Sequence, residues 1–436
     1  MYSILFLALL ALSPESVLGQ NSPQKCSEMR VRRSAHSLSP AEWDRIHSVV
    51  TELRSQGHFD QFARAHQAVF NDVHGKSAFF PFHRRFVLEF ENLGRRIDPQ
   101  FTIPYWDTTR EYRNPASSPV LRDNTLGGNG QGPDHCLQSG IQGGWEMNFP
   151  SGHCLRRNYN NGDSMNPWIA PEVISSYIQR DNNLDGFREH IEFSIHGATH
   201  LGLGGDASTR YAPNDFFFHM HHANIDRLWW QWQNNKDTMF DYNGPGQNGE
   251  AQLDDIIPQD RSLGFGNAPV SSVMVLGYNG VCYTYDSAPN PPSRYPGTRS
   301  GSDGEDDSNW AIRGGEPMSP LPMLSGSSIL ADRGLEISRI RKALGDNSEL
   351  KDFFPTIANM TTSRLETILS TDRGAQYKCK SKNDQRKEAL PIEYPAPMNE
   401  AWVKMHGFDP VRVAAIHREA CQLIDMLNNS TYVSPY

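Results

Sequence analysis

The sequence predicts a mainly helical protein with long irregular loops, few short strands and a helical C-terminal extension. Apolar residues recur at helical spacing in several stretches. The clearest series is Trp43, Ile46, Val49, Val50 and Leu53. Residues 108–165 are rich in Gly, Asn, Ser and Pro, which is typical of a long irregular region. Strand-like patterns are confined to 273–276 and 281–285.

Composition limits the classes of partner. The chain has 436 residues, and this length favours one large domain with a smaller appended region. Its net charge of −9 argues against binding to nucleic acid or to anionic lipid. After the first few residues no apolar run approaches the length of a membrane span.

The N-terminus and the cysteines indicate a secreted, extracellular or cell-wall protein. Residues 1–19 have the apolar core of a signal peptide. Disulfide bonds are then expected, and Cys136 and Cys154 are the best candidate pair because both lie in one Gly-rich loop. The other cysteines are Cys26, Cys282, Cys379 and Cys421. Glycosylation sequons occur at Asn359, Asn428 and Asn429.

Helix signals follow one another along the chain. Ser39 to Glu42 form a capping box with Pro40 at the first helical position, and Gly57 ends that helix. Further helices are expected over these ranges: about 60–66, 82–93, 171–180, 187–201, 215–235, 334–344, 362–370, and from Asp409 onward. The predicted units are 1–19 (signal peptide), 20–286 (main domain), 287–309 (linker) and 310–436 (helical extension).

Histidines form two groups with metal-binding potential. In the sequence HGATH, His196 and His200 are four residues apart, so a helix places both rings on one face. Gly197 follows the first of them, so the HExxH motif of zinc proteases is absent. His66, His74 and His83 form the second group. Two three-histidine sites suit a pair of copper ions.

The third histidine of the HGATH group must come from the stretch 215–232. This stretch contains His219, His221 and His222. On a helix His219 and His222 share a face, whereas His221 points elsewhere. Spacing alone therefore does not choose the ligand.

Five motifs together resemble the central domain of tyrosinases and polyphenol oxidases, which are type-3 copper proteins. The resemblance covers roughly residues 26–285. The motifs are HGKSAFFPFHRRFVLEFE (74–91), IPYWD (103–107), HGATHLGLGG (196–205), PNDFFFHMHHANIDRLW (213–229) and YTY (283–285). The resemblance implies a central four-helix bundle that holds two copper ions, with dioxygen as co-substrate.

The resemblance also implies which residues form the site. The copper ligands would be His66, His74 and His83 at one ion, and His196, His200 and His222 at the other. The family uses the second histidine of the His-His pair, so His221 would support it. Asp226 would orient a ligand imidazole or anchor its helix. His219 stands at a position that is normally apolar or aromatic.

The implied activity is oxidation of o-diphenols to o-quinones by O2, which would feed pigment or melanin-type polymerisation. Ortho-hydroxylation of monophenols is a further implied activity. Glu192 is the candidate catalytic residue, since it would position a water that deprotonates the phenol, and it could equally be a structural salt-bridge partner. Gly197 stands where strong monophenolases often have Asn, which weakens the expectation of hydroxylation.

Two alternatives belong to other functional classes. A hemocyanin-like protein would use the same two sites to bind dioxygen reversibly without turnover. A copper-free structural member of the fold would use neither.

The C-terminal extension either packs on the core or covers the site until the linker at 287–309 is cut. At the site entrance we expect the loop 208–213 to gate access, with Arg210 favouring acidic phenols.

Overall fold

The computed structural model describes most of the main domain and part of the extension. The described residues are 23–235, 238–259, 263, 266–287, 291–293, 295–296, 339–345, 347–360, 390–434 and 436. The predicted signal peptide, the predicted helix at 362–370 and most of the predicted linker lie outside them. None of the described helices combines the length and the apolar character needed to cross a membrane.

Helices dominate the described residues, as predicted. The helices of the main domain are α1 (Pro40–Ser55), α2 (His58–Val73), α3 (Phe79–Ile97), α4 (Pro171–Arg180), α5 (Leu184–Ile191), α6 (Gly197–Leu203) and α7 (Phe217–Asn235). A π-helical turn, η4 (Glu192–His196), joins α5 to α6. In the described part of the extension, residues 339–345 are helical, and the labelled helices are α10 (Leu350–Phe353), α11 (Pro355–Ala358), α13 (Glu400–His406) and α14 (Pro410–Asn428).

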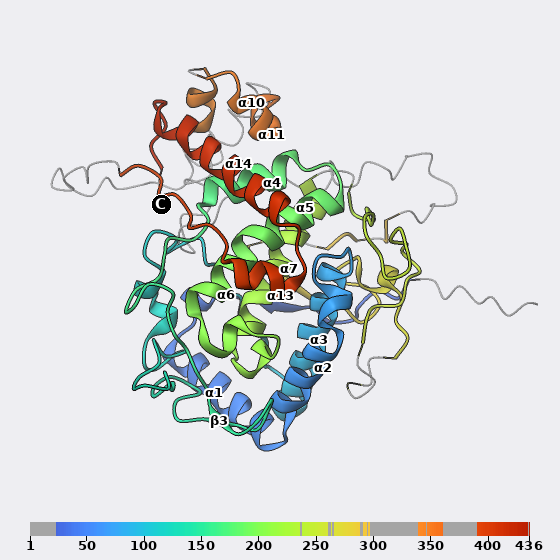
Figure 1. Ribbon diagram of the computed structural model, residues 1–436. Coiled ribbons are helices and arrows are strands. Elements are labelled where there is room, and N and C mark those ends of the chain that lie inside the picture. The colour runs from blue at the N-terminus through green and yellow to red at the C-terminus, as the bar shows by residue number, and fades with distance from the viewer. Residues whose placement is uncertain are drawn as a thin grey trace, which may run out of the picture.

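The centre of the molecule is a bundle of α2, α3, α7 and the continuous run from α5 through η4 to α6 (Figure 1). Stacked aromatic rings join the helices: Phe80 on α3 lies 5.3 Å from Trp229 on α7, measured between ring centroids. Phe187 on α5 stacks on Trp232 on α7 at 4.9 Å. All four rings are buried, so aromatic side chains form part of the core of the bundle.

The capping box at the first helix is confirmed. The Ser39 side chain accepts a hydrogen bond from the Glu42 amide, and the Glu42 carboxylate accepts one from the Ser39 amide at 2.8 Å. The helix consequently begins at Pro40. It ends at Ser55, just before Gly57, whose φ of 78° lies in the left-handed region that glycine favours.

The described strands are short, and two disulfides lie beside them. Strand β1 (Arg30–Arg32) pairs in parallel with β4 (Tyr283–Tyr285), next to the Cys26–Cys282 bond. Strand β2 (Glu146–Met147) pairs antiparallel with β3 (His153–Cys154), and the predicted Cys136–Cys154 bond is confirmed.

The predicted strand at 273–276 is wrong. A 3-10 helix, η8 (Val270–Val273), and turns occupy this segment. The buried side chain of Arg84 donates to the carbonyl oxygens of Val273 and Met274, at 2.9 Å and 3.1 Å. A side chain therefore satisfies carbonyl groups that a strand would pair with a neighbouring strand.

Asp226 fixes the closing strand β4 to the bundle. Its Oδ1 accepts a hydrogen bond from Nε of Arg84 at 2.5 Å. Its Oδ2 accepts hydrogen bonds from the hydroxyl groups of Tyr283 and Tyr285, each at 2.5 Å. Of the two roles expected for Asp226, the contacts show anchoring of the helix.

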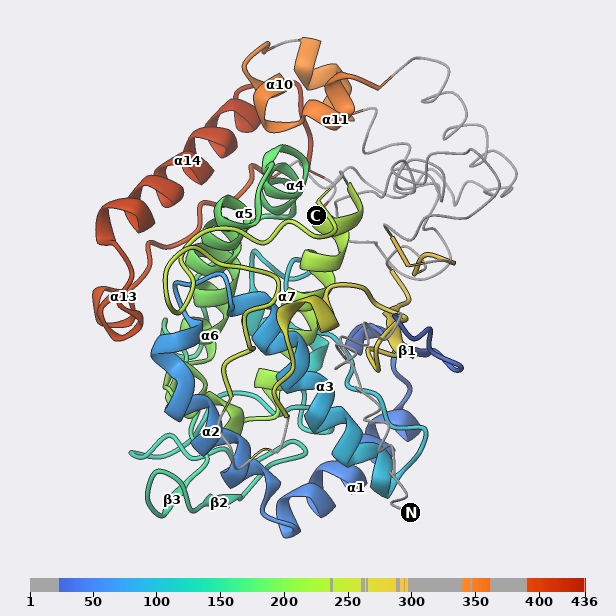
Figure 2. The same cartoon turned by 90° about the vertical axis from the view of Figure 1, so that its right-hand side faces the viewer.

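The described end of the extension lies along the bundle. Figures 1 and 2 show α14 beside α4 and α5, and α13 beside α6. Polar contacts join it to the core: Tyr432 donates to Glu172 at 2.9 Å, Arg412 pairs with Glu189 at 2.5 Å, and Arg113 donates to the carbonyl oxygen of Tyr436 at 3.0 Å.

Candidate metal centre

The structure brings His66, His74 and His83 together inside the bundle. His66 lies on α2, His74 follows the last residue of α2, and His83 lies on α3. Their ring centroids are 5.3 to 5.7 Å apart. One nitrogen from each ring lies within 4.8 Å of the other two, which is a spacing that one metal ion can bridge. All three side chains are buried.

Main-chain carbonyl groups fix the tautomer of these rings. The Nδ1–H groups donate to the carbonyl oxygens of Arg210 at 2.7 Å, Phe70 at 3.1 Å and Phe79 at 2.8 Å. Each ring therefore presents the lone pair of Nε2. The Nε2 atoms of His66 and His83 are buried without a hydrogen-bond partner among the described residues. Imidazoles that bind a metal have this arrangement, because the second nitrogen is held by an outer partner.

Burial keeps the imidazoles neutral. It lowers the pKa of His66 to about 4 and holds the pKa of His74 and His83 well below its usual range. A metal ligand must be deprotonated, so these rings need no proton release before they bind a cation.

His196 and His200 begin the second group. His196 ends the π-helical turn η4, and His200 lies four residues later on α6. Their ring centroids are 4.7 Å apart, and Nδ1–H of His200 donates to the carbonyl oxygen of Ala207 at 2.5 Å. The predicted shared face is confirmed. The π turn was not predicted; single turns of this kind are common at functional sites.

Helix α7 places both His221 and His222 at the second group. One nitrogen of His221 lies within 4.8 Å of nitrogens of His196 and His200, so the closest triad contains His221. The resemblance names His222 instead. The His222 ring stacks on His83 at 3.8 Å and lies 5.2 Å from His196, so it stands between the two groups. None of the ring nitrogens of the pair has a hydrogen-bond partner among the described residues.

Alanine substitution distinguishes the two candidates. We expect His222→Ala to lower the bound copper from two ions to one per chain, because His222 contacts both groups and matches the ligand position implied by the resemblance. We expect His221→Ala to retain both ions. Metal analysis of the purified variants after copper loading measures this. Loss of the second copper in His221→Ala, with both ions kept in His222→Ala, would transfer the role to His221.

Glu192 is buried and both of its oxygens are occupied. Oε1 accepts from the amide of Gly75 at 2.9 Å, and Oε2 accepts from Arg188 at 2.8 Å. Burial raises the pKa of this carboxyl to about 7, although the Arg188 guanidinium opposes the shift. The contacts match the salt-bridge role, and through Gly75 the carboxylate also fixes the loop that carries His74.

His219 belongs to the packing core. Its ring stacks on Phe90 at 3.7 Å and lies among Phe59, Phe62 and Phe86. Burial holds its pKa well below the usual range, so the ring is neutral. The aromatic neighbours explain how a histidine fits a position that the resemblance would give to an apolar residue.

The extension covers both histidine groups. On α13, the Trp402 ring lies 5.5 Å from the ring of His200, and the His406 ring lies 5.0 Å from that of His74. Nδ1–H of His406 donates to the carbonyl oxygen of Trp402 at 2.9 Å. We call residues 398–408 the cap. Sequence reasoning missed it, although Trp402 and His406 stand four residues apart on one helical face.

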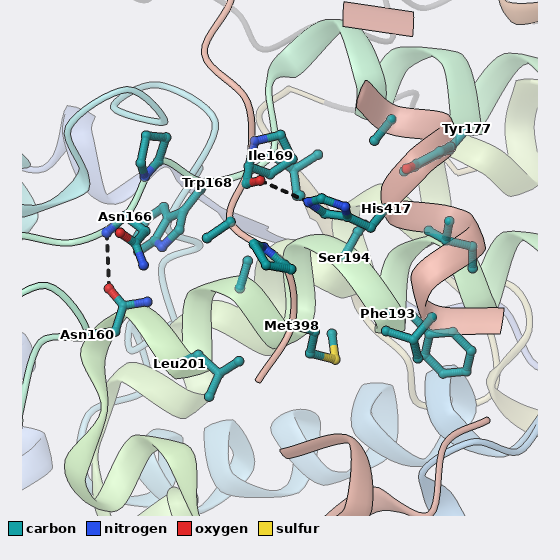
Figure 3. Close-up of a pocket in the computed structure, with 18 residues that line it drawn as sticks. Asn160, Asn166, Trp168, Ile169, Tyr177, Phe193, Ser194, Leu201, Met398 and His417 are labelled. Atoms are coloured by element: carbon teal, nitrogen blue, oxygen red, sulfur yellow. Dashed lines mark hydrogen bonds between the residues drawn. The ribbon is translucent and has the colours of Figure 1, made fainter. Parts of the chain in front are cut away.

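Arg210 contacts the cap. Its guanidinium donates to the carbonyl oxygen of Met405 at 2.9 Å and lies 4.6 Å from the centroid of the Phe70 ring. Phe193 on η4 packs against Phe408 of the cap at 4.4 Å. A pocket runs along the seam between α6 and the extension, with Phe193, Leu201, Met398 and His417 on its walls (Figure 3).

Comparison with known proteins supports the resemblance. Residues 56–235 match the family described as the common central domain of tyrosinase. The chain is 30% identical over 292 residues to tyrosinase ustQ of Aspergillus flavus, covering 60% of this chain and 80% of that protein. It is 34% identical over 230 residues to a tyrosinase of Streptomyces antibioticus, covering 47% of this chain and 83% of that protein.

A solved structure of a polyphenol oxidase from Thermothelomyces thermophila is similar with a TM-score of 0.46 and 21% identity. The similarity covers 59% of this chain and 88% of that one.

Proposed function

The chain belongs to the tyrosinase family of copper-dependent phenol oxidases, and we propose that it oxidises o-diphenols to o-quinones with dioxygen. The observation that carries this proposal is the pair of buried, neutral histidine groups that face each other across the bundle. The rings of His74 and His196, one from each group, lie 5.9 Å apart. When bound, two copper ions would supply the chemistry of dioxygen binding and of electron transfer at such a site.

The proposed ligands are His66, His74 and His83 for one copper and His196, His200 and His222 for the other. The protein's own part is to hold these imidazoles in one tautomer and to exclude water. Main-chain carbonyl groups orient four of the rings. Phe79 and Phe218 pack against the rings of His196 and His222 and surround them with apolar groups.

Glu192 is proposed to assist the hydroxylation of monophenols. A carboxyl with a pKa of about 7 can accept and return a proton near neutral pH. To do so it must exchange its contact with Arg188 or Gly75 for a water beside the substrate. Monophenol hydroxylation thus depends on a rearrangement, whereas catechol oxidation does not.

The extension is proposed to regulate access. The ligand histidines are buried beneath the cap, so a phenol reaches them only after α13 moves. This assigns residues 20–286 to the catalytic domain, 287–309 to a linker and 310–436 to a covering extension.

Secretion after removal of residues 1–19 is part of the same proposal, and the two described disulfides suit an oxidising compartment. The quinone product would feed pigment-type polymerisation.

Oxygen uptake tests the function. Full-length protein is loaded with copper and supplied with catechol or p-cresol, alongside the double variant Trp402→Ala/His406→Ala. We expect copper-dependent oxygen uptake and quinone absorbance with catechol, and neither in copper-free protein. Reversible dioxygen binding without quinone formation in the double variant would instead identify a hemocyanin-like carrier.

Glu192→Gln provides the second arm. We expect it to slow p-cresol hydroxylation at least tenfold more than catechol oxidation, because only the former needs the phenol proton removed by the enzyme. Equal losses on both substrates, or no p-cresol turnover by the parent protein, would reduce Glu192 to its structural contacts.

A further inference from the structure

Gly197 lies where the cap meets the metal centre. It begins α6 between the predicted ligands His196 and His200. We propose that the absence of a side chain at position 197 is what allows the cap to dock, so that this residue sets the balance between covered and open site. The inference rests on the proposed function for its consequence in catalysis, whereas the docking itself does not depend on copper.

The backbone at Gly197 does not require glycine. Its φ of −64° and ψ of −41° are ordinary helical values that every L-residue adopts. Glycine within a helix is in fact less stable than alanine, because it loses more conformational freedom on folding. Some other constraint must therefore explain a glycine here.

The constraint visible in the structure is space on the side of the cap. A Cβ built on Gly197 would lie 2.5 Å from Cε of Met398 and 3.2 Å from Nε1 of Trp402. Both neighbours belong to the cap and neither to the core. Figure 3 shows Met398 on the extension where it passes the helix that carries Leu201.

The two contacts differ in how easily they yield. Cε is the free end of the flexible Met398 side chain, so a single methyl group can push it aside. The Trp402 indole is buried, 4% exposed, and its ring is packed between His200 and His406. A larger side chain at position 197 must displace this ring, and with it α13.

A side chain larger than a methyl group at position 197 and a docked cap thus exclude each other. A mutation that disfavours only the docked state shifts the population toward the open state by the full size of the clash. A polar side chain placed beside His196 to act on a substrate would consequently come with an exposed metal centre. In this chain, glycine maintains the covered state.

The test measures amide hydrogen exchange of residues 399–408 in copper-free, full-length protein. We expect exchange to rise about tenfold or more in Gly197→Asn, and less in Gly197→Ala. Gly202→Ala is the matched control on the same helix: its Cβ would lie 2.6 Å from Nε1 of Trp168, a core residue. We expect that control to leave exchange in the cap unchanged.

Restoring the space should restore the cap. In the double variant Gly197→Ala/Met398→Ala, the rise in exchange of residues 399–408 is expected to be smaller than the sum of the rises in the two single variants. The reason is that the new methyl group occupies the volume that Met398 vacates. The proposal is overturned if exchange in the cap is unchanged in Gly197→Asn, or if it rises as much in Gly202→Ala as in Gly197→Asn. Strictly additive effects of the two substitutions in the double variant would also overturn it.

Catechol turnover of the copper-loaded variants separates the two proposals. Faster exchange together with faster turnover supports both. Faster exchange without any catechol oxidation leaves the role of Gly197 standing and contradicts the proposed function.

Discussion

Trp402→Ala/His406→Ala is expected to raise the catechol oxidation rate of copper-loaded protein at least tenfold. The Trp402 ring lies 5.5 Å from that of His200, and the His406 ring lies 5.0 Å from that of His74, so the two rings cover both histidine groups. Truncation of a buried aromatic side chain costs about 3 kcal/mol of packing. Since each 1.4 kcal/mol is about a factor of ten in a population, even half of this loss would open the site appreciably. Initial oxygen uptake at saturating catechol measures the effect.

Val411→Ala is the control for this experiment. Val411 lies on α14 and is 72% exposed, so its truncation removes no contact with the core. We expect wild-type rates from it. If the double variant and the control have the same rate, and both bind two copper ions, then α13 does not limit access and the covering role of the extension is wrong.

Asp226→Ala is expected to lower the free energy of unfolding of the copper-free protein by about 3 to 5 kcal/mol. The substitution leaves the buried guanidinium of Arg84 without its carboxylate and two buried tyrosine hydroxyls without their acceptor. Arg32 is also affected, because its Nη1 lies 3.6 Å from Oδ2. Urea unfolding followed by fluorescence gives the free energy.

Two further variants calibrate this value. Tyr285→Phe removes a hydroxyl that donates to Asp226 and accepts from Arg32, and it is expected to cost about 1 to 3 kcal/mol. Glu89→Ala removes the partly exposed ion pair with Arg85 on α3, the helix that also carries Arg84. It is expected to cost less than about 1 kcal/mol. An Asp226→Ala protein as stable as Glu89→Ala would show that β4 is held by other contacts.

Local patterns predicted much of the fold. The capping box at Ser39, the shared face of His196 and His200, and the Cys136–Cys154 bond each depend on residues close in sequence, and the structure confirms them. The strand expected at 273–276 failed for the opposite reason. Its carbonyl groups are satisfied by Arg84, which lies about 190 residues earlier in the chain.

The candidate site shows the same limit. Six histidines could be named from their motifs, but His221 and His222 are adjacent, so only the structure distinguishes them. The nitrogen distances group His221 with His196 and His200, whereas the ring of His222 stacks on His83. The expectation that Arg210 would favour acidic phenols did not include the cap. The Arg210 guanidinium donates a hydrogen bond to the carbonyl oxygen of Met405 in the cap. No local pattern could reveal that contact, because the two residues meet only after the extension has docked.

The polar contacts that tie the extension to the core have a consequence for cleavage of the chain. Glu172, Glu189 and Arg113 bind the extension at residues 432, 412 and 436, all of them far from the linker at 287–309. A cut in that linker would leave a complex of two polypeptides in which the smaller one acts as a bound inhibitor. While the linker is intact, it keeps the extension at a high effective concentration beside the site. After the cut, that value would fall to the concentration of the smaller polypeptide in solution. Dilution, and not the cut alone, would turn such an enzyme on.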